Sequence, residues 1–372
     1  LDGGLGQDSM VGGAGNDSYV VDNSGDVVVE SLNGGTADTI YSTLGVTLSA
    51  NVENLVYTGA ANVSLSGNSL DNILDGSGAG RNTLSGGAGN DTYVVNAARI
   101  GTLIENSSAG VDTIRFVGAS AALSSPVFAN IEALDFSQLT SNAAVTLSAS
   151  SSGIKTVFGS AGNDTIRATA NIGSAPVDAG AGADRFLFDA YSHIVSASVI
   201  GGAGVDTLSF SLPSTLGDAD FSKLSGVDFL SLNGAANGVT LGAKAQQAGI
   251  TSVRGGVDND TINAQAYTVG ITIDVSRNTN VEGALHSENT ILGGKSDDRI
   301  IFSNHNVVGA SSVVGGEGED TLSFAENGIS ITDDKFGVNI NQVEVLKTKD
   351  GTNYIQVGAS ALASNLQSVL GG

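Results

Sequence analysis

The stretch GGAGNDSYV at residues 12–20 combines three glycines, an asparagine and an aspartate, and then becomes apolar. Glycine reaches positive φ angles without a Cβ clash, so this chain can fold tightly and turn several backbone carbonyls toward one point. Asp17 adds carboxylate oxygens beside them. Because calcium prefers carbonyl and carboxylate oxygens, the stretch predicts a cation-binding turn followed by a short strand. For one isolated copy the alternative stays open that Asp17 only caps local backbone groups.

The same nine-residue pattern, G-G-x-G-x-D-x-U-x with U apolar, recurs along the chain. Nine copies have Asp at position six and one has Asn82, and all ten have an apolar or aromatic residue at position eight. Repetition at this level favours a stacked repeat architecture over ordinary turns, with position eight facing its interior. The copies begin at Gly3, Gly12, Ser77, Gly86, Gly159, Ala179, Gly201, Gly255, Gly293 and Gly315.

This pattern resembles the calcium-binding RTX, or hemolysin-type, nonapeptide repeat family. The resemblance implies an all-β fold: a right-handed parallel β-roll, or β-solenoid, with calcium-binding loops. In that family each nonapeptide supplies a turn and a short strand, and two of them make a coil of about 18 residues. The resemblance also implies several bound Ca²⁺ ions, held between loops on successive coils.

The spacing of the aspartates supports this interpretation, because carboxylates that share an ion should recur at about one coil. Asp38 and Asp112 lie outside the nonapeptides, yet Asp38 follows Asp17 at the same spacing at which Asp112 follows Asp91. Several loop aspartates later in the chain recur at closely similar spacings. The candidate metal-binding residues are Asp8, Gly12, Gly15, Asp17, Asp38, Gly86, Gly89, Asp91, Asp112, Asp164, Asp184, Asp206, Asp260, Asp298 and Asp320.

Three loops depart from the pattern. Asn82 supplies a neutral side chain where the other copies have a carboxylate. Asp258 and Ser296 stand at position four, where the pattern has glycine. We therefore expect these two loops to close differently from the rest.

Longer periods organise the chain into blocks. Residues 1–158 repeat with a period of about 74, the interval from Gly12 to Gly86, and residues 159–372 repeat with a period of about 114, the interval from Gly201 to Gly315. We expect duplicated blocks of one continuous solenoid, with short helical segments at Ala243 and Ala359. The final residues align with the start of another repeat, which predicts an internal piece of a longer protein.

Composition excludes several classes of function. The 372 residues include 15 Lys and Arg against 38 Asp and Glu, giving a net charge of −23, which disfavours nucleic acids and anionic membranes as partners. No apolar run approaches the ~18 residues of a membrane-spanning helix, so we expect no membrane insertion. Without cysteine, disulfides and thiolate metal sites are impossible.

The sequence lacks the H-E-x-x-H, G-x-S-x-G and phosphate-loop motifs, so we expect no enzymatic activity and no catalytic residues in this segment. A carboxylate pair of a glycan-cleaving enzyme remains an alternative. No basic residues cluster beside the acids to support it.

We therefore expect a structural, calcium-binding protein of the bacterial cell surface that folds in calcium and self-assembles into a surface layer or filament. Two alternatives remain. In the first, the chain is the repeat region of a type I-secreted enzyme, toxin or adhesin whose activity lies outside it. In the second, it binds cell-surface polysaccharide along the roll through an exposed Tyr191 or Tyr267.

Overall fold

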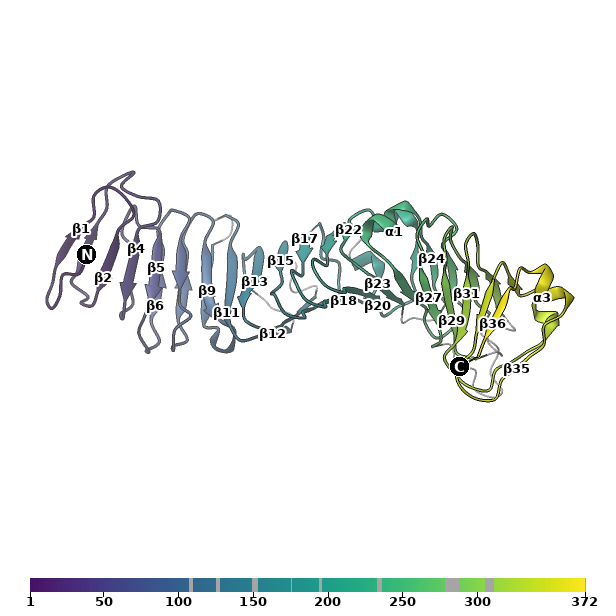
Figure 1. Ribbon diagram of the computed structural model, residues 1–372. Helices are drawn as coiled ribbons and strands as arrows, with labels where there is room; N and C mark the ends of the chain where they lie inside the picture. The colour runs from purple at the N-terminus through teal and green to yellow at the C-terminus, as the bar shows by residue number, and fades with distance from the viewer. Residues whose placement is uncertain are drawn as a thin grey trace. The chain divides into compact units, whose positions relative to one another are not determined.

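The computed structural model describes residues 1–106, 110–124, 128–148, 153–174, 176–193, 196–232, 236–277, 288–304 and 311–371. Short strands, pairing in parallel, make up almost all of its regular structure. Figure 1 shows the strands of each part as short arrows in succession. The prediction of a parallel β-solenoid is confirmed.

The chain forms two compact units. The first unit comprises Leu1–Ile166 and Ser174–Ala181, and the second comprises Arg167–Gly173 and Gly182–Gly372. The strand β16 (Thr165–Ala168) lies where the chain passes between them. The assignment of repeat blocks to residues 1–158 and 159–372 stays a prediction.

In the first unit most coils contribute one strand to a long sheet and one to a second sheet beside it; the exception is β4, which is followed directly by β5 of the same long sheet. The shorter sheets pair β1 (Ser9–Val11) with β3 (Val27–Val29), and β8 (Thr83–Ser85) with β6 (Ser64–Ser66) and β10 (Thr102–Ile104). Within this unit β12 (Ala121–Ser124) also pairs with β14 (Ala143–Leu147). A 3₁₀ turn, η1 (Ala97–Arg99), precedes β10. The long sheet has the order β2 (Ser18–Val21), β4 (Thr39–Ser42), β5 (Asn54–Tyr57), β7 (Ile73–Asp75), β9 (Thr92–Asn96), β11 (Thr113–Gly118), β13 (Ala133–Leu139), β15 (Thr156–Phe158) and β17 (Pro176–Asp178).

The second unit is built in the same way. Its long sheet has the order β18 (Arg185–Phe188), β20 (Thr207–Phe210), β23 (Phe229–Leu232), β25 (Ser252–Arg254), β27 (Thr272–Val275), β29 (Arg299–Phe302), β31 (Thr321–Phe324), β34 (Val345–Lys347) and β36 (Ser368–Leu370). A second sheet has the order β21 (Thr215–Leu216), β24 (Gly238–Thr240), β26 (Thr261–Asn263), β28 (Thr290–Leu292), β30 (Ser312–Val314) and β33 (Ile340–Asn341). Within this unit β19 (Ser198–Ile200) also pairs with β22 (Leu224–Ser225). A two-stranded sheet consists of β32 (Ser330–Ile331) and β35 (Tyr354–Ile355).

Short helical segments interrupt the coils of the second unit: η3 (Tyr191–His193), η4 (Asp218–Phe221), α1 (Ala243–Ala248), η5 (Asp333–Lys335) and α3 (Ala359–Ala363). The expected helical segments at Ala243 and Ala359 are confirmed as α1 and α3. Asp218 accepts hydrogen bonds from backbone N–H groups at the start of α1, and Asp333 does the same for α3. No helix among the described residues is long and apolar enough to cross a bilayer.

Each nonapeptide contributes the side chain at position eight to the interior. Position eight is buried in all ten copies, as predicted, and it lies on the inward face of a strand. Parallel, in-register pairing places like residues above one another, such as Phe188 beside Phe210 and Phe302 beside Phe324. One coil cannot bury its apolar side chains alone, so the fold depends on stacking.

Coil length varies more than the resemblance implied. Ser18 pairs with Thr39 and Thr39 pairs in turn with Asn54, so the second of these coils is clearly shorter than the first. The family pattern implies a constant coil of about 18 residues. In these two coils the difference in length lies in the connections, because β2, β4 and β5 stay in register.

Candidate metal centre

A ladder of side chains connects the loops of successive coils. The backbone N–H of each ladder residue donates a hydrogen bond to a side-chain oxygen of the equivalent residue one coil later, which explains the spacing of about one coil between aspartates. A carboxylate acceptor makes such a bond strong. These bonds join Asp17 to Asp38 at 2.7 Å, and Asp91 to Asp112, Asp184 to Asp206 and Asp298 to Asp320 each at 2.8 Å.

The ladder includes residues that the nonapeptide search missed. The N–H groups of Asp38, Asp112 and Asp320 donate to glutamate side chains, each at 2.9 Å. The sequence contains a signal for them, because each glutamate stands two positions after an Asn or Gln: Asn51, Asn130 and Gln342. In the structure these three residues have positive φ, of 64°, 57° and 49°. The acceptors are Glu53, Glu132 and Glu344.

The second carboxylate oxygen divides eight of the ten nonapeptides into two groups. In the copies that begin at Gly159, Gly255 and Gly293, it accepts a hydrogen bond from the N–H at position two of the same loop. The donors are Ser160 to Asp164 at 2.5 Å, Gly256 to Asp260 at 2.8 Å and Gly294 to Asp298. We call these three the closed loops. Their aspartates have both oxygens engaged by the protein itself.

In five other copies, which we call the open loops, the second oxygen is buried and meets no hydrogen-bond donor in the part of the chain that the structure describes. Asp38, on the ladder, shares this property. A buried polar atom without a partner costs about 1–3 kcal/mol, and more when it is charged. The open-loop oxygens belong to Asp8, Asp17, Asp91, Asp206 and Asp320.

Glycine conformation explains the difference between the groups. Each open loop has positive φ at positions two and four, as at Gly13 (100°) and Gly15 (104°). The closed loops have no positive φ at these positions, and each has Ser160, Asp258 or Ser296 at one of them. L-residues with a Cβ strongly disfavour the left-handed region. The expectation that the loops containing Asp258 and Ser296 close differently is confirmed.

Two copies belong to neither group. Gly180 and Gly182 in the copy at Ala179 have positive φ, of 93° and 132°, like the glycines of the open loops. In the copy at Ser77, the Asn82 side chain accepts from Val63 N–H at 3.1 Å and donates to the Gly76 carbonyl at 3.1 Å. The ladder therefore continues there with a neutral group.

The first glycine of a nonapeptide has a different role from the one we expected. Gly15 and Gly89 have positive φ, but Gly12 and Gly86 do not. Instead, a Cβ on Gly12 or Gly86 would collide with the loop aspartate and with a tyrosine hydroxyl. In these two loops position one is glycine because oxygen atoms converge on it.

Three carboxylates meet at two places in the first unit. One oxygen each from Asp17, Glu30 and Asp38 lie within 4.8 Å of one another, and the same is true of Asp91, Glu105 and Asp112. Oxygens bound to one calcium at 2.3–2.6 Å lie no more than about 5 Å apart. The residues present therefore fit calcium by chemistry and by spacing. Glu30 and Glu105 lie outside the nonapeptides, and the sequence analysis missed them.

The electrostatics of these loops favour a cation. Burial, and then the charges of Glu105 and Asp112, raise the pKa of Asp91 to about 7. Burial is also the largest cause that raises the pKa of Asp112 to about 6 and that of Asp320 to about 7. A bound Ca²⁺ supplies the positive charge that would stabilise the ionised carboxylates.

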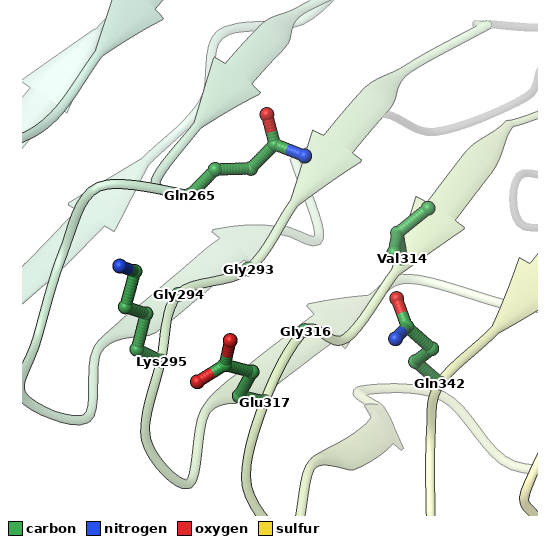
Figure 2. Close-up of a pocket in the computed structure, with 8 residues that line it drawn as sticks. All are labelled: Gln265, Gly293, Gly294, Lys295, Val314, Gly316, Glu317 and Gln342. Carbon is green, nitrogen blue, oxygen red and sulfur yellow. The ribbon is translucent and has the colours of Figure 1, made fainter.

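A shallow pocket of about 200 Å³ lies at the closed loop that begins at Gly293 and the open loop that begins at Gly315. Figure 2 shows the two loops side by side, with Lys295 on the first and Glu317 on the second. Glu317 N–H donates to the Gly294 carbonyl at 3.0 Å, so backbone contacts also connect the loops. The closed loop thus carries a cationic side chain of its own.

One tyrosine expected at a polysaccharide groove is buried. Tyr267 is fully buried, and its hydroxyl donates to the Ile250 carbonyl, so its expected exposure is wrong. Tyr191 is half-buried, with its ring centroid 6.4 Å from that of Phe210. The position of each tyrosine within its coil determines its exposure, because both rings pack against neighbouring strands or turns.

Comparison with known proteins agrees with the geometry. The family model for the RTX calcium-binding nonapeptide repeat matches four copies, within residues 1–27, 66–97 and 152–171. No curated protein and no solved structure matches the chain. The matched segments contain three open loops, at Gly3, Gly12 and Gly86, and the closed loop at Gly159. The chain is therefore a β-solenoid in which residues 1–27, 66–97 and 152–171 match the RTX calcium-binding nonapeptide repeat.

Proposed function

We propose that calcium drives the folding of this chain outside the cell, and that the folded solenoid is a structural element of a bacterial surface layer or filament. The observation that carries the proposal is the set of buried carboxylate oxygens in the open loops that lack a hydrogen-bond donor among the described residues. Folding without a cation would bury these charges uncompensated. Folding and calcium binding are therefore coupled.

The mechanism is mass action. A ligand that binds only the folded state stabilises it by about 2.7 kcal/mol per site when its concentration is 100 times its dissociation constant. Several open loops add such contributions along one stack. Extracellular calcium-binding modules typically have dissociation constants of about 10⁻⁴–10⁻³ M, so the low calcium concentration inside a cell would leave this chain unfolded.

A structural role is supported by the surface as well. The net charge of −23 opposes close approach of two copies until cations neutralise it. Large apolar side chains are exposed at turns, with Leu5 98%, Leu32 80% and Val205 66% exposed. Once the charge is neutralised, such residues favour contacts between copies.

Negative-stain microscopy and light scattering of the purified chain, in calcium and in chelator, test the assembly. We expect ordered sheets or filaments in calcium that disperse when chelator is added. Dispersed, folded monomers at all calcium concentrations would contradict assembly. They would favour the repeat region of a secreted enzyme, toxin or adhesin instead.

A further inference from the structure

A cluster of four residues, most of them buried, occurs twice in the first unit. Each copy combines the aspartate of an open loop, the tyrosine two positions later, a glutamate that directly follows a strand of a shorter sheet, and the next ladder aspartate. The first site consists of Asp17, Tyr19, Glu30 and Asp38, and the second of Asp91, Tyr93, Glu105 and Asp112. The glutamates follow β3 and β10, so each site joins a shorter sheet to the long sheet.

Each glutamate is fixed in place from two sides. The Tyr19 hydroxyl donates to Glu30 Oε1, and Ser31 N–H donates to Glu30 Oε2 at 3.1 Å. In the second site the Tyr93 hydroxyl donates to Glu105 Oε2, and Asn106 N–H donates to Glu105 Oε1 at 2.7 Å. The tyrosines are fully buried, and the glutamates are only 7% and 8% exposed. An ionised glutamate in such surroundings needs a compensating charge.

The oxygens of each site converge on a glycine without a side chain. A Cβ on Gly12 would collide with Tyr19 Oη, Glu30 Oε1 and Asp17 Oδ2. A Cβ on Gly86 would collide with Asp91 Oδ2 and with Tyr93 Oη. Gly86 N–H also donates to Tyr93 Oη at 2.7 Å, which holds the hydroxyl beside the loop.

An independent observation points to a ligand. Asp38 and Asp91 are fully buried, and the Oδ2 atom of each meets no hydrogen-bond donor from the residues that the structure describes. Both aspartates also belong to the carboxylate triads. Of the candidate ligands, a hard divalent cation satisfies an unpartnered oxygen and three converging carboxylates together.

We propose that Glu30 and Glu105 complete two equivalent calcium sites, in which Tyr19 and Tyr93 act as positioning residues for the glutamates. This inference rests on the proposed calcium binding and adds ligands from outside the nonapeptide. Three carboxylates give each site more negative charge than a loop aspartate alone, and calcium affinity rises with the charge of the ligands. These two sites therefore fill before the other open loops.

Terbium luminescence tests the placement of the ions, because a tyrosine close to a bound Tb³⁺ ion sensitises its emission. The chain has seven tyrosines and no tryptophan. We expect Tyr19→Phe and Tyr93→Phe each to remove about half of the sensitised emission, and the double variant to remove nearly all of it. Tyr41→Phe is the matched control, since Tyr41 is 40% exposed on β4, and it should leave the emission unchanged. Full emission from the double variant would overturn the placement of the ions.

The calcium content of the folded protein tests the glutamates. Glu30→Gln and Glu105→Gln should each lower the bound calcium by one ion, measured by elemental analysis after gel filtration at limiting calcium. Asp22→Asn, an exposed acid next to β2, is the control for lost charge. An unchanged calcium content in both glutamate variants would overturn the inference and leave the proposed function standing. A wild-type chain that binds no calcium would overturn both.

A variant that does not fold would be recognised by circular dichroism in calcium. In that case the two tyrosine variants decide, because loss of one hydroxyl leaves the buried ring in place, and their calcium affinity is measured by isothermal titration calorimetry. Weaker calcium binding by Tyr19→Phe, with unchanged β-structure, supports the positioning role. Unchanged affinity contradicts it.

Discussion

At the scale of single residues, two features decide whether a loop can hold a cation: the conformation of its glycines and the partners of its aspartate oxygens. Gly15 and Gly89 have φ angles of 104° and 115°. These angles belong to the left-handed region, which residues with a Cβ disfavour by roughly 1–2 kcal/mol. Each glycine thus stabilises the conformation of an open loop, which we propose is the one that binds calcium.

Gly15→Ala isolates this conformational contribution, because a Cβ on Gly15 would meet open space. We expect the free energy of unfolding in calcium to fall by about 1–2 kcal/mol through backbone strain alone. Urea denaturation followed by circular dichroism measures it. Gly217→Ala is the control, since Gly217 has φ −92° and nothing closer than 3.9 Å to an added Cβ. Equal effects of the two substitutions would contradict the role of positive φ.

The buried carboxylates predict an unusual pH dependence in calcium-free buffer. The pKa of Asp91 is raised from its ordinary value of 3.8 to about 7, so the fold disfavours its ionised form. The stability that protonated Asp91 contributes is present below pH 3.8 and is lost as the pH rises toward 7. Asp112 and Asp320 act in the same direction.

We therefore expect the β-sheet circular dichroism of the calcium-free protein to be stronger near pH 5 than near pH 7.5. Saturating calcium should remove the difference, because cation binding favours the ionised carboxylates. An Asp91→Asn variant should show a smaller pH effect than the wild type. If the calcium-free protein instead lost structure on acidification, the pKa values of these carboxyl groups would not be raised by the fold.

At the scale of elements, the distinction between open and closed loops separates repeats that look alike in sequence. Asp206 lies in an open loop, whereas Asp260 has both carboxylate oxygens hydrogen-bonded. We expect Asp206→Asn to lower the number of calcium ions bound and Asp260→Asn to leave it unchanged, as measured by isothermal titration calorimetry. Asparagine keeps one oxygen for the ladder in both variants. If Asp260→Asn removed an ion and Asp206→Asn did not, the grouping of the loops would be wrong.

The sequence predicts the elements better than it predicts the site. The apolar residue at position eight is buried in all ten nonapeptides, as predicted, because strand alternation leaves little freedom there. The spacing of Asp17 and Asp38 also indicated that their loops are stacked. Glu30 and Glu105 escaped prediction because they follow strands of the shorter sheets, and only the three-dimensional coil brings them to the loop aspartates.

At the scale of the whole molecule, the central claim is that the fold and its cations form one thermodynamic system. Parallel pairing and stacked apolar side chains supply the favourable burial, and the ladder carboxylates oppose it until they are neutralised. Since each coil contacts only its neighbours, stabilising one loop stabilises the coils beside it. Calcium-induced folding should therefore be cooperative along each unit.

The most direct test is a calcium titration of the whole chain at pH 7.5, followed by far-ultraviolet circular dichroism, with magnesium as the control cation. We predict a cooperative transition from a largely unstructured chain to β-structure in calcium, reversed by chelator. Magnesium should act only weakly, because it requires near-octahedral geometry and gives up its water reluctantly. A spectrum that is fully β-structured in chelator and unchanged by calcium would contradict the account, and GGAGND would then be only a turn.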